Sequence, residues 1–431
     1  MNYSLDGLTP SAVERPKGLD ELSAALASAN ASGLAVVPWG GGTRIGVGNV
    51  PSGYDVALDL TGHTGHLEHV AGDLTVIVDG GVRIGDLNGV LEKEGQRLPF
   101  EVHSPGQATV GGSVASNAPG RRQSSTGGIR DWVIGMQIVL ADGTVTKSGG
   151  RVVKNVQGYD LHRLHTGAYG TLGVISQVAF KLAPTLAVQQ TVVAWFDDVR
   201  SAREVGLNLV NGLFAPEAIS LVSGPLASDV VTAAGEAAPD LQRTDPGNHD
   251  GMWTLLVRLG GGVRSIERQV NEVTGAAGAS GATGYAVLDG NTAGKAWGLL
   301  DGAGSAADVT ARVTARTAFA LDISEALIQR NLANPTNGPA GVSIICDLGF
   351  GALTVLASAV SDEQALSFVN TVVTEVSQSS GSYVIEKCPL AVKQQMDVFS
   401  DVGNSIEIMR RIKNQYDPAN TLNPGRFAGK I

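Results

Sequence analysis

Residues 105–117 read PGQATVGGSVASN, a stretch in which most side chains are small or carry a hydroxyl or amide group. Small residues let a ligand or another backbone segment approach closely. The side chains of Thr109, Ser113, Ser116 and Asn117 add donors and acceptors suited to phosphate and ribose oxygens. The stretch therefore predicts a loop that holds a phosphorylated ligand.

A second glycine-rich loop lies upstream, where residues 38–46 read PWGGGTRIG. Glycines let successive backbone N–H groups converge on an anion, and a diphosphate is the ligand that this arrangement favours. The chain holds 57 glycines in 431 residues, so chance alone would supply about one such triplet, and residues 260–262 form another. An ordinary surface loop is the alternative for this segment, and the prediction depends on the two loops together.

Two arginines, Arg121 and Arg122, follow the second loop. Their guanidinium groups would balance the charge of a diphosphate, and the alternative is a pair of solvated arginines. The sequence has no Gly-Lys-Ser/Thr, and no Gly-x-Gly-x-x-Gly opens a helix after a strand. Nucleotide sites of the ATP and nicotinamide types are therefore disfavoured.

Composition limits the class of protein. A length of 431 residues predicts two or three domains, and 43% hydrophobic with 17% charged residues is typical of a chain that folds throughout. The net charge of -10 disfavours nucleic acid and anionic lipid as direct partners. We find no apolar segment long enough to span a bilayer and no apolar leader, so we expect a cytoplasmic protein with no direct membrane insertion.

The cysteines argue against a redox cluster in this chain. Cys346 and Cys388 lack Cys-x-x-Cys spacing and lie in or beside apolar segments. Neither an iron-sulfur cluster nor a disulfide framework is indicated. We expect two buried free thiols.

Hydrophobic periodicity predicts alternating helices and strands up to about residue 184. The expected helices cover 19–29 and 84–94, and the expected strands cover 35–37, 56–60, 74–79, 133–140, 144–147 and 172–182. An Asp-Gly turn at 142–143 predicts a hairpin between two of these strands.

The pattern changes after about residue 186 and predicts a second domain. Strands are expected at 192–195, 253–259 and 343–348, and a helix at 363–376. The Gly- and Ala-rich stretch 275–307 predicts loops or loosely packed helices. Near the C-terminus, Asn404 and Ser405 are expected to cap a helix that runs to Tyr416 and ends at Asp417-Pro418.

A third motif completes the pattern, with KNVQGYDL at 154–161 leading through HTGAYGTLGVI at 165–175 into a strand. With both glycine loops in this order, it resembles the FAD domain of the vanillyl-alcohol oxidase and para-cresol methylhydroxylase superfamily. Within that superfamily, GGRVVKNVQGYDL at 149–161, and GRR at 120–122 followed by GIRD at 128–131, resemble the small FAD-binding subunits of bacterial glycolate oxidases.

The resemblance covers about residues 34–184, and a shorter one involves YDP at 416–418 and LNPGR at 422–426. It implies an α+β fold with a two-lobed FAD-binding domain of the para-cresol methylhydroxylase type at 1–184, the lobes covering about 1–72 and 73–184. A mainly antiparallel α+β cap domain would follow at 185–390. The tail at 391–431 would return to the FAD domain.

The same resemblance implies site residues. Gly40–Thr43 and Gly46 would hold the pyrophosphate, the second loop would line the FAD, the Val174-Ile175 backbone would meet the flavin ring, and Asn423 with Arg426 would close the pocket. The complete expected cofactor set is Pro38, Gly40, Gly41, Gly42, Thr43, Arg44, Gly46, Pro105, Thr109, Gly112, Ser113, Ser116, Asn117, Arg121, Gly170, Val174, Ile175, Asn423 and Arg426. Relatives with covalent flavin usually have a histidine in the first loop, where this chain has Thr43-Arg44, so non-covalent FAD is expected.

Histidines are scarce where the superfamily uses them. The cap motif His-x-Gly-Asp-Gly-Asn-x-His of its 2-hydroxy acid dehydrogenases is absent, and no histidine follows His249. His63, His66 and His69 recur every three residues, but a turn between strands is favoured over a metal cluster. We assign no metal site and no catalytic residue.

Other polar residues lie near the FAD motifs. They are candidates for proton chemistry, although a structural role is favoured: His103, Tyr159, Asp160, His162 and His165.

The function implied is that of an FAD-binding subunit of a glycolate oxidase or dehydrogenase, which oxidises glycolate, a small 2-hydroxy acid, to glyoxylate. A larger catalytic flavoprotein subunit and an iron-sulfur subunit would be its partners, and they would account for any peripheral association with the inner membrane. One alternative is a self-sufficient FAD-linked oxidase or dehydrogenase of a 2-hydroxy acid or other alcohol. Another is a non-catalytic assembly subunit.

Overall fold

The computed structural model describes residues 2–151, 158–237, 252–333, 339, 341–358 and 360–431. Residues 154–157 of the third motif therefore lie outside the described part. The chain divides into two compact units: the first comprises 1–120, 127–185 and 393–431, and the second comprises 121–126 and 186–392.

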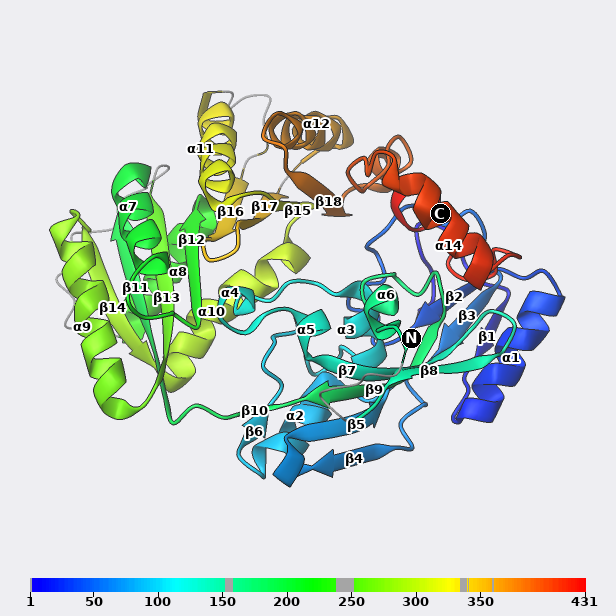
Figure 1. The fold of residues 1–431 in the computed structure, drawn as a ribbon. Coiled ribbons are helices and arrows are strands. Elements are labelled where there is room, and N and C mark those ends of the chain that lie inside the picture. The colour runs from blue at the N-terminus through cyan, green and yellow to red at the C-terminus, as the bar shows by residue number, and fades with distance from the viewer. Residues whose placement is uncertain (1, 152–157, 238–251, 334–338, 340, 359) are drawn as a thin grey trace. The chain divides into compact units, whose positions relative to one another are not determined.

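The first unit contains a small parallel sheet in the order β1-β3-β2, drawn in blue in Figure 1. Its strands are β1 (Ala12–Glu14), β2 (Val36–Trp39) and β3 (Val56–Asp59). Helix α1 (Leu19–Ala31) buries Leu22, Leu26 and Ala29 in a core that it shares with β2 and β3. The helix and the strands predicted from periodicity here are confirmed.

The second sheet of the first unit is antiparallel and has the order β4-β5-β9-β7-β8. Its strands are β4 (Leu67–Val70), β5 (Thr75–Asp79), β7 (Val133–Val139), β8 (Val145–Gly149) and β9 (Val174–Lys181). The predicted β7–β8 hairpin is confirmed, and Gly143 adopts a φ of 85° in its turn. This sheet already begins at Leu67, before the boundary near residue 73 expected between the lobes.

Helices α2 (Ile84–Glu92) and α3 (Val110–Ser116) share a core with this antiparallel sheet. Ile84, Leu87 and Leu91 recur at the helical period along α2, and all three are buried. Shorter elements of the unit are η1 (Ala71–Asp73), β6 (Gln96–Arg97), which pairs with β10 (Ala183–Pro184), α5 (Ile129–Trp132) and α6 (His162–His165).

The second unit is built on one antiparallel sheet in the order β14-β11-β13-β12-β16-β17-β15-β18. The strands are β11 (Val188–Phe196), β12 (Ala218–Ser223), β13 (Trp253–Gly261), β14 (Gly284–Asp289), β15 (Val309–Thr314), β16 (Gly341–Asp347), β17 (Ala352–Ser358) and β18 (Ser382–Lys387). The helices are α7 (Val199–Val210), α8 (Pro225–Ala237), α9 (Val263–Ala279), α10 (Gly290–Ala306), α11 (Thr317–Ala333) and α12 (Asp362–Gln378), with α4 (Gln123–Thr126) from the early segment. Helix α13 (Leu390–Lys393) stands at the boundary.

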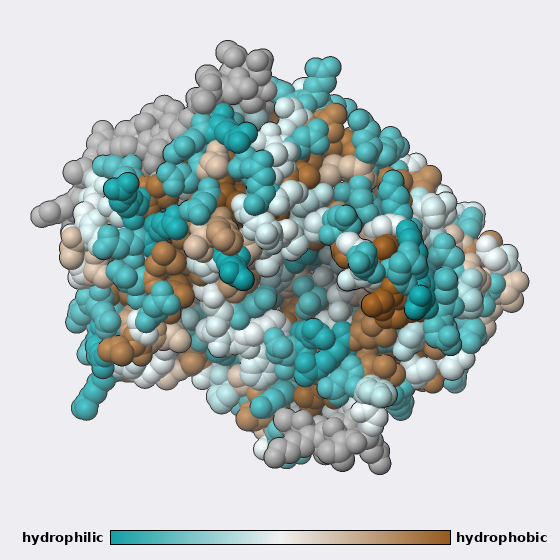
Figure 2. Space-filling model, turned by 45° about the horizontal axis from the view of Figure 1, so that its top comes forward, coloured by the Kyte–Doolittle hydropathy of each residue, from teal (hydrophilic) through white to brown (hydrophobic). Residues whose placement is uncertain are grey.

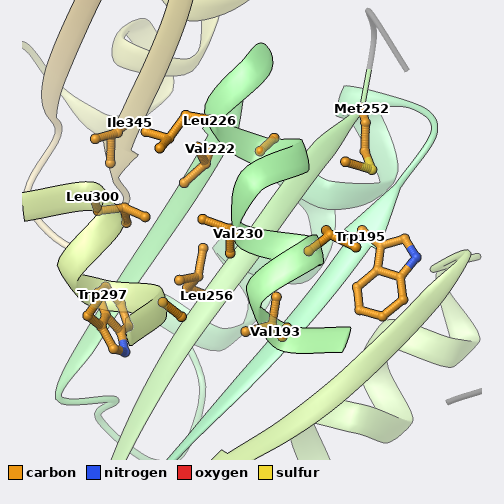
Figure 3. Close-up of a cluster of buried hydrophobic side chains, with 14 of the residues drawn as sticks. Val193, Trp195, Val222, Leu226, Val230, Met252, Leu256, Trp297, Leu300 and Ile345 are labelled. Carbon is orange, nitrogen blue, oxygen red and sulfur yellow. The ribbon is translucent and has the colours of Figure 1, made fainter. Parts of the chain in front are cut away.

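Its core includes a cluster between the sheet, α8 and α10. In Figure 3, Val230 of α8, Leu256 of β13 and Trp297 of α10 lie in this cluster. The Trp297 Nε1 donates to Thr191 Oγ1 at 2.9 Å, so the one polar atom of this ring is satisfied.

The stretch 275–307 differs from its prediction as loops or loosely packed helices. It forms the end of α9, the strand β14 and the 17-residue helix α10. Ala286 and Leu288 alternate into the core from β14, while Trp297 and Leu300 bury one side of α10. Tertiary packing by a few large residues overrides the weak local preferences of glycine here.

The segment 121–126 also departs from the sequence boundaries, because it belongs to the second unit. Arg121 pairs with Asp347 at 3.1 Å and with Asp301 at 3.2 Å, and Arg122 lies 3.5 Å from Glu217. The side chains of Arg121 and Arg122 are only 11% and 15% exposed, so the two arginines are not a solvated surface pair. Three carboxylates of the second unit thus hold this segment.

The C-terminal part of the first unit contains α14 (Ser405–Tyr416) and η2 (Ala428–Lys430). The predicted helix and its end at Asp417 are confirmed. Asn404 has helical backbone angles and its side chain makes no capping hydrogen bond, so the expected side-chain cap is wrong.

The two cysteines differ in burial. Cys346 is buried, which raises the pKa of its thiol, whereas Cys388 is half-buried rather than buried, and neither cysteine forms a disulfide.

Among the described residues, none of the helices has both the length and the hydropathy needed to cross a membrane. On the face shown in Figure 2, apolar residues appear as separate spots among polar ones.

Acid should destabilise the first unit through His165. This ring is 3% exposed, meets Tyr416 edge-on with centroids 5.4 Å apart, and has a pKa lowered to about 4 by burial. Between pH 6.5 and 4 the unfolded chain therefore binds a proton that the folded chain refuses, so stability falls as pH drops, by about 3 kcal/mol in total. His165→Leu should flatten this pH dependence in urea unfolding at pH 7 and pH 5. The half-exposed His66→Gln is the control, and an unchanged slope in His165→Leu would contradict the assignment.

Candidate cofactor-binding site

A hollow in the first unit lies where the first glycine loop, the second loop and the C-terminal tail meet. Eleven of the residues expected from the sequence line it: Pro38, Gly40, Gly41, Gly42, Thr43, Arg44, Thr109, Gly112, Ser116, Asn423 and Arg426. The remaining lining residues are Ile45, Val47, Ala115 and Tyr169. Segments far apart in the chain therefore converge on one hollow.

Two glycines of the first loop pack directly against the second loop. A Cβ atom on Gly41 would lie 1.8 Å from the carbonyl oxygen of Gln107, and one on Gly40 would lie 2.1 Å from Thr109 Oγ1. Gly42 adopts a φ of 75°, which side chains disfavour. These positions need glycine for the contact between the loops, whatever ligand the loops hold.

The stretch 105–117 is not a loop throughout, as predicted, because residues 110–116 form α3. Thr109 forms the N-cap of this helix by accepting from the Gly112 N–H at 3.4 Å. The buried Ser113 hydroxyl donates to the Thr109 carbonyl at 2.8 Å, so Ser113 supports the helix. Thr109, Gly112 and Ser116 line the hollow, whereas Ser113 does not.

The C-terminal tail reaches the hollow by running parallel to β2. The Val36 N–H donates to Thr421 O at 2.7 Å, and the Asn423 N–H donates to Val36 O at 2.9 Å. A single parallel bridge, Val36 with Leu422, thus joins the tail to the strand that leads into the first loop. This pairing brings Asn423 and Arg426 to the hollow.

Arg426 is a buried cation, and one of its two terminal nitrogens already makes hydrogen bonds. Its Nη2 donates to Ile45 O at 2.5 Å and to Val47 O at 2.6 Å. Burial lowers the pKa of Arg426 to about 10, so the group remains charged at neutral pH. The buried Nη1 has no hydrogen-bond partner among the described residues.

In the described part of the chain, Asn423 has an unpaired acceptor, where Arg426 has an unpaired donor. Its Nδ2 donates to Tyr169 O at 2.6 Å, while its buried Oδ1 lacks a partner within the described residues. A buried polar atom without a partner is costly, so a ligand offering an anionic oxygen and a donor would satisfy both residues. FAD carries both kinds of group, and the hollow therefore suits it.

The other expected site residues lie beside the hollow or away from it. The Gly46 carbonyl accepts from Lys393 Nζ at 2.9 Å, and the Pro105 carbonyl accepts from the Gly85 N–H at 2.8 Å. Asn117 ends α3 with a φ of 42°. Arg121 belongs to the second unit.

Three more expected residues also lie outside the lining. Gly170, with a φ of 69°, adjoins Asn423, since a Cβ there would lie 3.3 Å from Asn423 Nδ2. Val174 and Ile175 begin β9, and a Cβ on Gly111 would lie 3.2 Å from Ile175 O. The Ile175 backbone therefore packs against Gly111, next to Gly112 in the lining of the hollow.

Sequence reasoning missed an aromatic group at the site. Tyr169 packs against Phe399 and Phe427, with ring centroids 5.6 Å apart in both cases. Tyr169 adopts a φ of 53°. It lies between Gly167 and Gly170 in the motif 165–175, and these two glycines were the available sequence signal. Nothing in the local sequence signals that the two phenylalanines reach it.

The histidines have separate partners. His63 lies 3.9 Å from Asp79, His66 lies 3.9 Å from Glu68, and His69 contacts Gln96 at 2.9 Å. No group of three potential metal ligands occurs within the part of the chain that the structure describes.

None of the candidates for proton chemistry lines the hollow: His103, Tyr159, Asp160, His162 and His165. Tyr159 is 89% exposed, Asp160 lies 3.3 Å from Arg163, and burial lowers the pKa of His162. These three residues therefore have structural or surface positions.

Residues 10–149 match the family described as FAD binding domain, and residues 399–427 match the family of FAD linked oxidases, C-terminal domain. The chain is an FAD-dependent oxidoreductase. Both glycine loops fall within the first match and both orphaned side chains, Asn423 and Arg426, within the second.

Relatives of known name extend this flavoprotein assignment. The chain is 25% identical to glycolate oxidase subunit GlcD of Bacillus subtilis over 98% of its own length and 89% of that protein. It is 38% identical to glycolate oxidase subunit GlcE of Escherichia coli over 30% of its length, and 36% identical to D-lactate dehydrogenase of Archaeoglobus fulgidus over 42%. These last two alignments span only 37% and 40% of those proteins.

The fold of this flavoprotein also occurs among solved structures. Alkyldihydroxyacetonephosphate synthase superposes with a TM-score of 0.71 at 15% identity, over 96% of this chain and 77% of that one. At that identity the similarity concerns the fold alone. The expected α+β fold, with a two-lobed FAD-binding domain and a mainly antiparallel cap domain, is confirmed.

Proposed function

We propose that this flavoprotein is the FAD-binding subunit of a glycolate oxidase or dehydrogenase, and that it contributes to oxidation of glycolate, a small 2-hydroxy acid, to glyoxylate. The observation that carries the proposal is the hollow at the two glycine loops, where Asn423 and Arg426 each keep a buried polar atom for a ligand. The near full-length similarity to a glycolate oxidase subunit supports the substrate class.

In this proposal the residues of the hollow hold the cofactor. Arg426 would donate from Nη1 to an anionic oxygen, Asn423 would accept from a ligand N–H or O–H, and the Gly40–Gly42 backbone would follow the diphosphate. Bound FAD would supply the two-electron acceptor for oxidation of the carbon that carries the substrate hydroxyl. Tyr169 and its aromatic neighbours would exclude water from one side of the hollow.

The proposal includes two partners. The chain has two cysteines, fewer than the four that ligate a cysteine-bound iron-sulfur cluster, and we expect onward electron transfer through a cluster to need an iron-sulfur subunit. No histidine follows residue 249, so the superfamily's cap histidines would come from a larger catalytic flavoprotein subunit. Attachment to a membrane surface would likewise depend on these partners.

A self-sufficient FAD-linked dehydrogenase is the second candidate, favoured by the partial similarity to D-lactate dehydrogenase. Purification of the chain alone separates the two. We expect a yellow protein that does not turn over glycolate or D-lactate with a dye acceptor until the larger flavoprotein and iron-sulfur subunits are added. Turnover by the isolated chain would establish the second candidate. A colourless protein that fails to take up added FAD would contradict the site and leave an assembly subunit.

A further inference from the structure

Lys413 is a buried lysine that does not line the hollow but contacts segments leading to it. Lys413 of α14 is 4% exposed, and its Nζ donates to Asp417 Oδ2 at 2.6 Å, to Leu422 O at 2.8 Å and to Thr171 O at 2.8 Å. An ammonium group has three donors. All three are therefore used, and two of them bind backbone carbonyls from segments about 250 residues apart in the chain.

Asp417 completes the arrangement. It is 1% exposed, its Oδ1 accepts from the Thr421 N–H at 2.9 Å, and its Oδ2 accepts from the Leu422 N–H at 2.7 Å. Both oxygens thus fix the turn that follows α14. That turn delivers the tail to β2, where Leu422 pairs with Val36.

The two carbonyls that Lys413 joins lie one or two residues from side chains that line the hollow. Thr171 follows Tyr169 by two residues, and Leu422 directly precedes Asn423. Asn423 in turn donates to Tyr169 O at 2.6 Å. Lys413 therefore joins the Tyr169–Thr171 segment to the Leu422–Asn423 segment. The hydrogen bond from Asn423 to Tyr169 joins the same two segments at the hollow.

Stability alone is a poor explanation for a buried ion pair. Removing two charges from water costs several kcal/mol, and apolar residues of similar size often serve as well or better. Burial lowers the pKa of Lys413, and Asp417 opposes that shift, as expected for a desolvated pair. What an apolar pair cannot do is hold two carbonyls and two N–H groups in fixed positions.

We propose that Lys413 and Asp417 are positioning residues for FAD, because their ion pair fixes Asn423 and Arg426 relative to the Tyr169–Thr171 segment. Neither residue lines the hollow. The inference rests on the proposed assignment of the hollow as the FAD site, and it adds to that site two residues that act from outside its lining.

The test is FAD affinity together with stability in the full-length protein. Lys413→Met should weaken FAD binding about tenfold or more and should lower the urea midpoint, because Asp417 is left as a buried charge without its partner. The double variant Lys413→Met with Asp417→Asn removes both charges. We expect it to recover most of the urea midpoint but to bind FAD as weakly as Lys413→Met, because Thr171 and Leu422 no longer share a donor.

Two further variants complete the test. Arg410→Met with Glu407→Gln removes the exposed pair one turn earlier on α14, 3.1 Å apart, and should leave both FAD affinity and midpoint unchanged. Asp417→Asn alone keeps the shape of the carboxylate and gives a second measurement should the lysine variants fail to fold. FAD is titrated by quenching of its fluorescence, at urea concentrations where each variant is folded.

Recovery of both affinity and midpoint in the double variant would overturn the inference and leave the pair a purely structural role, as would wild-type affinity in folded Asp417→Asn. Failure of the unmodified protein to bind FAD is a different result, since it would contradict the site itself.

Discussion

Gly41→Ala is expected to weaken FAD binding about a hundredfold or more, equivalent to about 2.7 kcal/mol. The new Cβ would lie 1.8 Å from the backbone oxygen of Gln107, and backbone atoms of a packed loop cannot move aside without separating the two loops. The hollow that both loops line would widen with them. Stability should also fall, by about 1–3 kcal/mol, which is typical of overpacking.

The measurement is FAD titration by fluorescence quenching, with urea unfolding of the same samples. Gly89→Ala is the matched control, because Gly89 is an exposed position in α2 where a Cβ would meet nothing within 4 Å. That substitution should leave FAD affinity unchanged and raise stability by about 0.5–1 kcal/mol. FAD affinity within a factor of about three of wild type in Gly41→Ala would contradict the close contact between the loops.

Arg426→Met should produce the second large effect, again about a hundredfold in FAD affinity. It removes the free Nη1 donor and leaves the carbonyls of Ile45 and Val47 without their partner, at about 1–3 kcal/mol for each. A fall in the midpoint of thermal unfolding and a loss of yellow colour on purification should therefore appear together. Arg426→Lys keeps the charge but loses the fork that serves two carbonyls and a ligand, so its affinity should be intermediate.

Arg410→Met is the control for the arginine series. Arg410 also lies in the C-terminal part of the first unit, but its side chain is 52% exposed and is paired with Glu407. Exposed pairs contribute little, so both colour and midpoint should match wild type. A yellow Arg426→Met protein with unchanged FAD affinity would show that the orphaned Nη1 does not serve the cofactor.

The elements predicted from the sequence are those with regular apolar spacing. Leu22 and Leu26 in α1, or Leu87 and Leu91 in α2, repeat at the helical period, so their burial follows from sequence alone. The 275–307 stretch lacks such a repeat, because glycines and alanines carry no spacing signal. Its strand and helix depend on partners elsewhere in the second unit, which no local pattern contains.

The candidate site shows the same division. Glycine loops and the LNPGR motif at 422–426 are continuous in sequence, and most of their predicted residues line the hollow. Lys393 and Lys413 look like ordinary surface lysines in the sequence, yet they are 6% and 4% exposed. Their roles arise from acceptors far along the chain, such as Gly46 O and Thr171 O, and long-range pairings of this kind have no sequence signature.

The addition of the tail to β2 has a consequence for how the holoprotein is made. Ile45 and Arg426, whose contact completes one wall of the hollow, are separated by 381 positions. During synthesis both glycine loops and the whole second unit are available to fold before Arg426 exists. Contacts between positions so far apart in sequence are slow to form. With the hollow as the FAD site, we therefore expect cofactor loading to follow translation of residues 421–426, and a ribosome-bound chain arrested before them to carry no flavin.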